Sequence, residues 1–220
     1  MIDAGAGATL GPTAGRLPAA LAAAGIAPDD IDTVLLTHLH PDHSAGLIDP
    51  SGEPLFPRAE LHLHEDEMAY WQDDTALSRA TEPNRSFFPA ARAQVRAYRD
   101  RLHALRPGDV FPGVTWLPLP GHSPGHTGYR IASGDAALLI WGDVVTIQDV
   151  QVPRPDTAFF FDLDPLTAAA TRRRVLDRAA TDRLLVGGMH VHFPGFGRVI
   201  RDGTSFRLVP DVWSVWSDDL

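Results

Sequence analysis

The chain has 220 residues, and its 28 acidic side chains outnumber 19 basic ones, which gives a net charge of −9. A composition of 44% hydrophobic and 21% charged residues is typical of globular proteins and excludes intrinsic disorder. No apolar run reaches the roughly 18 residues of a membrane span, the acidic charge disfavours nucleic acid as a partner, and the lack of cysteine excludes disulfides and thiolate ligands.

Apolar periodicity and turn residues predict helices and strands that alternate along the chain. In order, we expect a loop at 5–15, a helix at 17–24, a helical turn at 28–31, strands at 33–37 and 59–64, a helix at 65–71, a mobile loop at 72–86, a helix at 87–105, strands at 114–119, 128–132 and 136–141, a helix at 164–180, a strand at 184–186, and a hairpin of 199–200 with 206–209. This alternation predicts one α/β (α+β) domain over residues 1–220, with a layered sheet core. No signal peptide opens the chain, so we expect a cytoplasmic protein.

The densest group of histidines follows the buried strand expected at 33–37. It contains His38, His40, Asp42 and His43 within six residues. Imidazole and carboxylate groups are the usual ligands of zinc and neighbouring divalent metals. His38 and His40 point the same way in an extended segment, whereas Asp42 and His43 follow the bend at Pro41. The spacing therefore favours two metal positions over a histidine-rich surface loop.

Three later predicted strands also end in potential ligands. His122 and His126 follow the strand at 114–119, and either could be the ligand while the other supports it by a hydrogen bond. Asp143 follows the strand at 136–141 and could bridge two cations. His190 and His192 follow the strand at 184–186, and one of them could complete a site. Each feature alone is compatible with an ordinary turn, but their recurrence indicates one site at a sheet edge.

Other polar and aromatic residues receive structural interpretations. His62 and His64 are read as strand residues that share a face, and His103 as a solvated or half-buried residue of the long helix. Seven aromatic residues could line an apolar pocket or pack in the core, with core packing expected for about half of them: Trp71, Phe87, Phe88, Phe159, Phe160, Phe161 and Phe193.

The segment 38–43 has the pattern HxHxDH. His122, Asp143 and His190 follow it along the chain. The phrase His-x-x-Phe-Pro-Gly-x-Gly begins at His190. From residue 2 to about residue 210, the chain therefore resembles the metallo-β-lactamase-fold hydrolases, in the branch of methyl parathion hydrolase-like and lactonase-like enzymes. The resemblance implies a four-layer αββα sandwich with a dinuclear site at one sheet edge.

The resemblance also implies a ligand set and a chemistry. His190 is preferred to His192 because it keeps the family's offset to Phe193, and His126 becomes a supporting residue. Two divalent ions, zinc first with manganese, iron or cobalt as alternatives, would hold a bridging hydroxide that attacks a small-molecule ester, lactone or organophosphate. Asp42 would also accept a proton. The implied ligands are His38, His40 and His122 for one ion, Asp42, His43 and His190 for the other, and Asp143 as the bridge.

Two features depart from the family pattern. The chain begins inside a segment that several strands usually precede, so we expect an incomplete first sheet. Thr146 stands three residues after Asp143, where quorum-quenching lactonases often have a tyrosine. The alternative hypothesis is therefore a truncated, inactive or partner-dependent metal-binding member of the fold. The net negative charge disfavours a nuclease of this fold. A homodimer is a further expectation.

Overall fold

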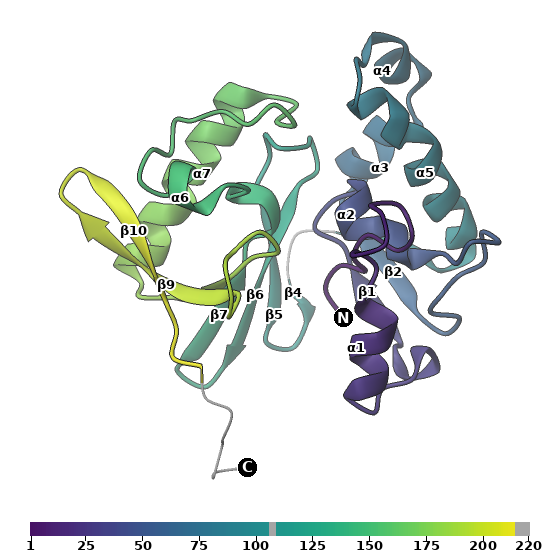
Figure 1. The fold of residues 1–220 in the computed structure, drawn as a ribbon, viewed down its shortest axis with the longest axis horizontal. Coiled ribbons are helices and arrows are strands. Elements are labelled where there is room, and N and C mark those ends of the chain that lie inside the picture. The colour runs from purple at the N-terminus through teal and green to yellow at the C-terminus, as the bar shows by residue number, and fades with distance from the viewer. Residues whose placement is uncertain (106–108, 214–220) are drawn as a thin grey trace. The chain divides into compact units, whose positions relative to one another are not determined.

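The computed structural model describes residues 1–105 and 109–213, and the chain divides into two compact units. The first unit comprises Met1–Pro107 with Pro124–Thr127, and the second comprises Gly108–Ser123 with Gly128–Leu220. Each unit has its own β-sheet and its own hydrophobic core (Figure 1). The mixed α/β class is thereby confirmed, whereas the organisation as a single domain over 1–220 stays a prediction.

The sheet of the first unit consists of three parallel strands in the order β1-β2-β3. The strands are β1 (Thr33–Leu35), β2 (Glu60–Leu63) and β3 (Leu102–Ala104). Their register aligns Val34 with Leu61, and Leu61 with Leu102. Ile2 adds a parallel bridge to Leu35, which brings the beginning of the chain to the sheet.

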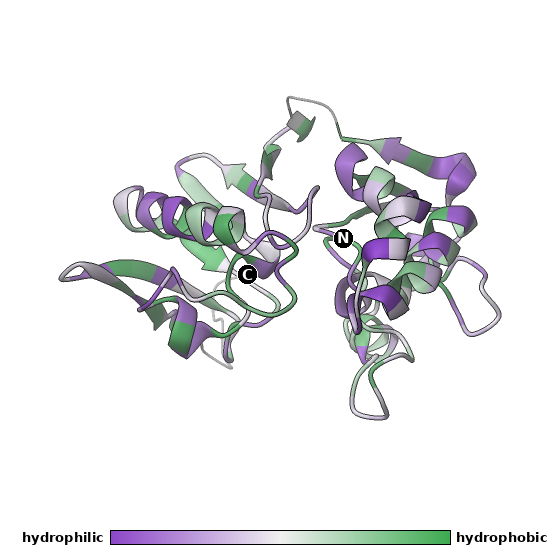
Figure 2. Ribbon diagram, turned by 90° about the horizontal axis from the view of Figure 1, so that it is seen from above, coloured by the Kyte–Doolittle hydropathy of each residue, from purple (hydrophilic) through white to green (hydrophobic). Residues whose placement is uncertain are grey.

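Short helices connect these strands and bury a large aromatic core against them. Phe56, Trp71, Phe88 and Tyr98 are all fully buried in this core. Both the strands and the helices carry hydrophobic and hydrophilic residues (Figure 2). The helices are α1 (Leu17–Ala23), η1 (Pro28–Asp30), α2 (Pro41–Ser44), η2 (Ala45–Leu47), α3 (Glu65–Gln72), α4 (Asp74–Arg79), α5 (Asn84–Ala97) and η3 (Arg99–Arg101).

Two predicted boundaries in this unit are wrong. The loop expected at 72–86 contains α4, because the Asp73 side chain accepts a hydrogen bond from the Thr75 N–H and caps a helix there. The helix expected at 87–105 spans 84–97 instead. Residues 102–104 alternate in burial and pair with β2, so a strand replaces the last turns of that helix.

The same boundaries correct the interpretation of two histidines. His103 lies in β3, not in a helix, and its ring stacks on His62 of β2 with 5.0 Å between ring centroids. His64 lies one residue beyond β2, where its Nδ1 accepts the Asp66 N–H and caps α3. A histidine at a strand end can therefore serve as a helix cap.

The second unit is built on a seven-stranded sheet in the order β10-β9-β8-β7-β6-β5-β4. Strands β7 and β8 are parallel, whereas the β6–β7, β8–β9 and β9–β10 pairs are antiparallel. β4 was not predicted from the sequence, and β9 and β10 extend the expected hairpin. The strands are β4 (Asp109–Phe111), β5 (Val114–Pro118), β6 (Thr127–Ser133), β7 (Ala136–Ile140), β8 (Leu185–Gly187), β9 (Phe196–Asp202) and β10 (Ser205–Pro210).

Three helical segments belong to this unit, namely η4 (Gly142–Val144), α6 (Gln148–Gln151) and α7 (Pro165–Thr181). α7 begins as the sequence predicts, because Asp164 accepts the Thr167 N–H and Pro165 occupies the first turn. Its buried face includes Leu176, which belongs to the core of the unit. Within the described residues, no helix is both long and apolar enough to span a bilayer.

Two leucines of α7 provide a matched test of this packing. Leu176 is fully buried, whereas Leu166 on the first turn is 85% exposed. We expect Leu176→Ala to lower the free energy of unfolding by about 2–5 kcal/mol, because it leaves a cavity in the core. Leu166→Ala should change it by no more than about 0.5 kcal/mol. Guanidinium chloride unfolding measures both, and equal losses would contradict the packing described.

Candidate functional site

The first group of potential ligands lies beyond the carboxyl end of β1. His38 and His40 are both buried, and His38 Nε2 lies 3.0 Å from His40 Nδ1. The ring of His40 also meets the ring of Trp71 edge-on, with 5.6 Å between centroids. The packing of Trp71 thus limits the rotation of the His40 ring. The nitrogen atoms of His38 and His40 lie close enough together to bind the same ion.

Asp42 and His43 lie on α2, the short helix that starts at Pro41. Their side chains approach each other, with 3.4 Å between His43 Nε2 and Asp42 Oδ2. The opposite ring nitrogen, His43 Nδ1, lies 2.8 Å from Asp3 Oδ2. A carboxylate at Nδ1 holds the proton on that nitrogen, so Nε2 is left as the metal-binding atom.

Asp3 organises this end of the sheet through both carboxylate oxygens. Its Oδ1 accepts the Thr37 N–H at 2.7 Å, and its Oδ2 accepts the Thr37 hydroxyl at 2.8 Å. The backbone N–H of Asp3 donates to the Leu35 carbonyl at 2.9 Å, which fixes the residue beside β1. Asp3 was not among the predicted site residues, although it ends a short apolar segment at the beginning of the chain.

Glu67 fixes the loop between His38 and His40 from the side of α3. It is fully buried, and its Oε1 accepts the Leu39 N–H at 3.0 Å and the Trp71 indole N–H at 2.7 Å. Its Oε2 accepts the Gly125 N–H at 3.1 Å. Gly125 has to be glycine because a Cβ there would lie 2.3 Å from the Glu67 nitrogen. Beside this contact, the His126 ring lies 5.1 Å from the His38 ring.

The second unit presents three of the predicted residues together. Asp143 lies in η4, directly after β7, and His190 follows β8. Asp143 Oδ2 lies 3.3 Å from His122 Nε2 and 3.3 Å from His190 Nε2. One carboxylate oxygen therefore contacts both imidazoles. The exposed fraction is 34% for the His190 side chain and 3% for the His122 side chain, so this group is open on the His190 side.

A buried carboxylate and a buried guanidinium hold His122 in place. Asp162 Oδ1 lies 3.0 Å from His122 Nδ1, and Asp162 Oδ2 lies 3.4 Å from a terminal nitrogen of Arg172. Burial alone would raise the pKa of Asp162, but the hydrogen bonds from His122 and the Phe159 N–H, with the charge of Arg172, hold the pKa below its usual value. Asp162 therefore stays ionised and orients His122, a role that the sequence analysis missed.

The remaining residues considered from the sequence do not join these groups of potential ligands. The His192 side chain is 63% exposed and lies 3.1 Å from Asp149, so it does not take part in the contact with Asp143. The Thr146 hydroxyl donates to Gln151 Oε1 at 3.0 Å. Of the aromatic residues, Trp71 and Phe88 are core residues, whereas Phe160 and Phe193 are largely exposed.

The donor set in each unit fits divalent metal ions. Imidazole nitrogens and carboxylate oxygens are the ligands that zinc accepts when thiolates are absent. In a tetrahedral site with bonds of about 2.0–2.1 Å, two ligand atoms of one ion lie about 3.3 Å apart. The distances from Asp143 to His122 and to His190 have this value, and the two atoms of Asp42 and His43 lie 3.4 Å apart.

Comparisons with known proteins agree with this chemistry. A family model described as the Metallo-beta-lactamase superfamily matches residues 1–190. The crystal structure of the hydrolase AbOPH matches 97% of this chain and 75% of its own, with a TM-score of 0.90 and 30% identity. The structure of AidC, a dizinc quorum-quenching lactonase with a bound product, also matches 97% of this chain and 75% of its own, with a TM-score of 0.91 and 26% identity.

A curated relative matches over a shorter segment. The N-acyl homoserine lactonase AiiB of Agrobacterium fabrum is 46% identical over 54 residues, which are 24% of this chain. The chain spans only 17% of the length of that relative. This match is therefore local, and the activity of that protein does not by itself describe this chain.

Glu67 and Glu65 provide a test of the buried hydrogen bonds on α3. We expect Glu67→Gln to lower the free energy of unfolding by about 1–3 kcal/mol. Both oxygens of the Glu67 carboxylate accept hydrogen bonds, so the amide NH₂ of glutamine would place a donor against a backbone or indole N–H. Glu65→Gln, on the exposed side of the same helix, should leave stability nearly unchanged. Urea unfolding compares the two, and a Glu67→Gln variant as stable as Glu65→Gln would refute the role assigned to Glu67.

Proposed function

Because the chain belongs to the metallo-beta-lactamase superfamily, we propose that it is a dinuclear metal-dependent hydrolase of lactones and related esters. The observation that carries the proposal is the contact of Asp143 Oδ2 with His122 and His190 at 3.3 Å each, an arrangement that suits a carboxylate placed between two ions. The group of His38, His40, Asp42 and His43 supplies the remaining donors.

We assign the ligands as the family resemblance implies. Zinc is the first expectation for both ions, and manganese, iron or cobalt would accept the same nitrogen and oxygen donors. The orienting carboxylates Asp3 and Asp162 support the assignment, because each contacts the ring nitrogen opposite the proposed metal-binding atom. The assigned ligands are His38, His40 and His122 for one ion, Asp42, His43 and His190 for the other, and Asp143 for both.

Metal ions in such a site would supply Lewis-acid activation of water and of the substrate oxygen. The side chains of the chain have distinct tasks around that chemistry. Asp3 and Asp162 fix the ring orientation of His43 and His122. Asp42 is 32% exposed, whereas the His43 side chain is fully buried, so Asp42 is the group placed to accept a proton and pass it to solvent.

Lactones are the favoured substrate class because AidC, similar over nearly the whole chain, is a lactonase, and the local relative AiiB is one as well. Thr146 differs from the tyrosine of the lactonase pattern, and its hydroxyl is engaged by Gln151. Aryl esters and phosphotriesters therefore remain in the proposed range. A small-molecule substrate is the partner required, while a cytoplasmic location and a homodimer stay predictions.

The proposal is tested by metal analysis together with a hydrolysis screen. Protein purified after growth with zinc should contain about two ions per chain and hydrolyse one or more of lactones, aryl esters, phosphotriesters and β-lactams. His38→Ala should reduce that hydrolysis more than about 100-fold, since even outer residues of metal sites contribute 10–100-fold. His103→Ala, on β3, should retain activity.

Two results would contradict the proposal when they occur together. One is a metal content below about one ion per chain, and the other is unchanged hydrolysis by His38→Ala. Bound metal without hydrolysis of any substrate class would instead favour the alternative of a non-catalytic metal-binding member.

The orienting role of Asp162 gives a separate prediction. Asp162→Asn should weaken metal binding by about 10–100-fold, because the amide no longer holds the His122 ring through a charged hydrogen bond. Asp149→Asn, which alters the contact with the exposed His192, should leave metal affinity unchanged. Competition with a chromophoric chelator measures both affinities, and similar values for the two variants would show that Asp162 does not support the site.

A further inference from the structure

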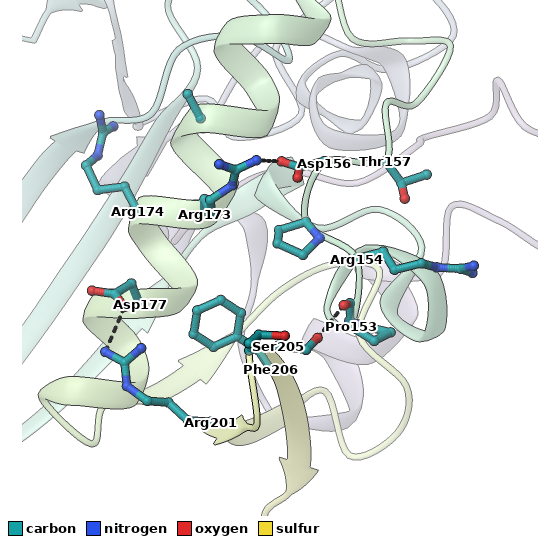
Figure 3. Close-up of a pocket in the computed structure, with 13 residues that line it drawn as sticks. Pro153, Arg154, Asp156, Thr157, Arg173, Arg174, Asp177, Arg201, Ser205 and Phe206 are labelled. Carbon is teal, nitrogen blue, oxygen red and sulfur yellow. Dashed lines mark hydrogen bonds and ion pairs between the residues drawn. The ribbon is translucent and has the colours of Figure 1, made fainter.

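The second unit contains a cavity of about 1090 Å³ that includes none of the proposed metal ligands (Figure 3). Three segments line it: residues 153–157 after α6, one side of α7, and the hairpin of β9 and β10. Its volume lies slightly above the range of about 300–1,000 Å³ that is typical of sites for small molecules and cofactors. The cavity therefore has room for a ligand of the size of a nucleotide.

Arginine is the most frequent residue type in the lining of this cavity. Arg173 forms an ion pair with Asp156, and Arg201 forms one with Asp177 at 2.7 Å. These pairs hold two guanidinium groups at opposite sides of the cavity in Figure 3. The lining set comprises Arg154, Arg173, Arg174 and Arg201, with Asp156 and Asp177 as its acidic members.

Two of these arginines are not neutralised. Arg154 and Arg174 form no ion pair with any side chain in residues 1–105 and 109–213. Four arginines against two aspartates give the lining a net charge of about +2, although the whole chain carries −9. A concentration of positive charge on an acidic protein raises the local concentration of anions.

An apolar wall completes the cavity. The Phe206 ring lies under the Arg201 guanidinium, at 5.9 Å from its central carbon to the ring centroid. Pro153 and Pro155 line the same space. The Ser205 hydroxyl donates to the Pro153 carbonyl and ties the hairpin to the 153–157 segment. The organic part of a ligand can thus contact carbon atoms while its charged part meets the arginines.

We propose that this cavity binds a phosphomonoester, such as a nucleoside monophosphate. A phosphomonoester carries a charge of about −1.5 to −2 at neutral pH, which balances the excess charge of the lining. Guanidinium groups bind phosphate oxygens through paired N–H donors, which a spherical anion such as chloride cannot match. The inference does not depend on the proposed hydrolytic function.

Isothermal titration calorimetry of the metal-loaded protein at low ionic strength tests the proposal with three probes, AMP, inorganic phosphate and adenosine. AMP and phosphate should compete for one site, and adenosine should show no binding. The double variant Arg154→Gln/Arg174→Gln should bind AMP at least about tenfold more weakly, since each substitution removes a charged donor. The single variants should each show part of this loss.

Arg178→Gln is the matched control. Arg178 lies one turn after Arg174 on α7, pairs with Asp182 and does not line the cavity, so its loss should leave AMP affinity unchanged. The double variant should keep the wild-type unfolding midpoint and wild-type hydrolysis. Equal AMP affinity of the double variant and the wild type, equally tight binding of adenosine, or no binding of AMP and phosphate would overturn the proposal. Binding that survives the double substitution would place the phosphate elsewhere, the metal ions included.

Discussion

The cost of burying carboxylates beside the strand ends is the constraint on which the rest of this structure depends. A carboxylate removed from water is tolerated only when several donors surround it. Asp3, Glu67 and Asp162 each meet that requirement with donors from separate segments. The hydrogen bonds to these carboxylates also fix the segments that carry the histidines. The same hydrogen bonds therefore stabilise each unit and orient the imidazole rings.

The ends of the strands explain where the potential ligands lie, in loops or in the short helices α2 and η4 that follow a strand. Each of three strands ends a few residues before a potential ligand: β1 before His38, β7 before Asp143 and β8 before His190. Residues at strand ends are free of ladder hydrogen bonds, so their side chains can turn toward a ligand. Metal chemistry thus uses positions that contribute little to the cores of the units.

The potential ligands were predictable because they cluster within a few residues or follow readable strands, as in the segment 38–43. The class of the fold followed from the alternation of elements, and it is confirmed. Asp3, Glu67 and Asp162 were not predicted, because their contacts with the segments that carry the histidines join residues 28 to 58 positions apart in the sequence. β3 was missed for a related reason: a three-residue strand shows its alternation only when its neighbour β2 is known.

Arg172 joins two parts of the second unit that have been described separately. Its guanidinium is buried and donates to the carbonyls of Pro155 and Thr157, which belong to the arginine-lined cavity, while it also contacts Asp162 behind His122. The planar guanidinium presents its N–H donors in a fixed arrangement, so one rigid group makes the hydrogen bonds on both sides. Arg172 therefore supports the 155–157 segment of the cavity lining and the carboxylate that orients His122 together, so these two parts of the unit share one structural support.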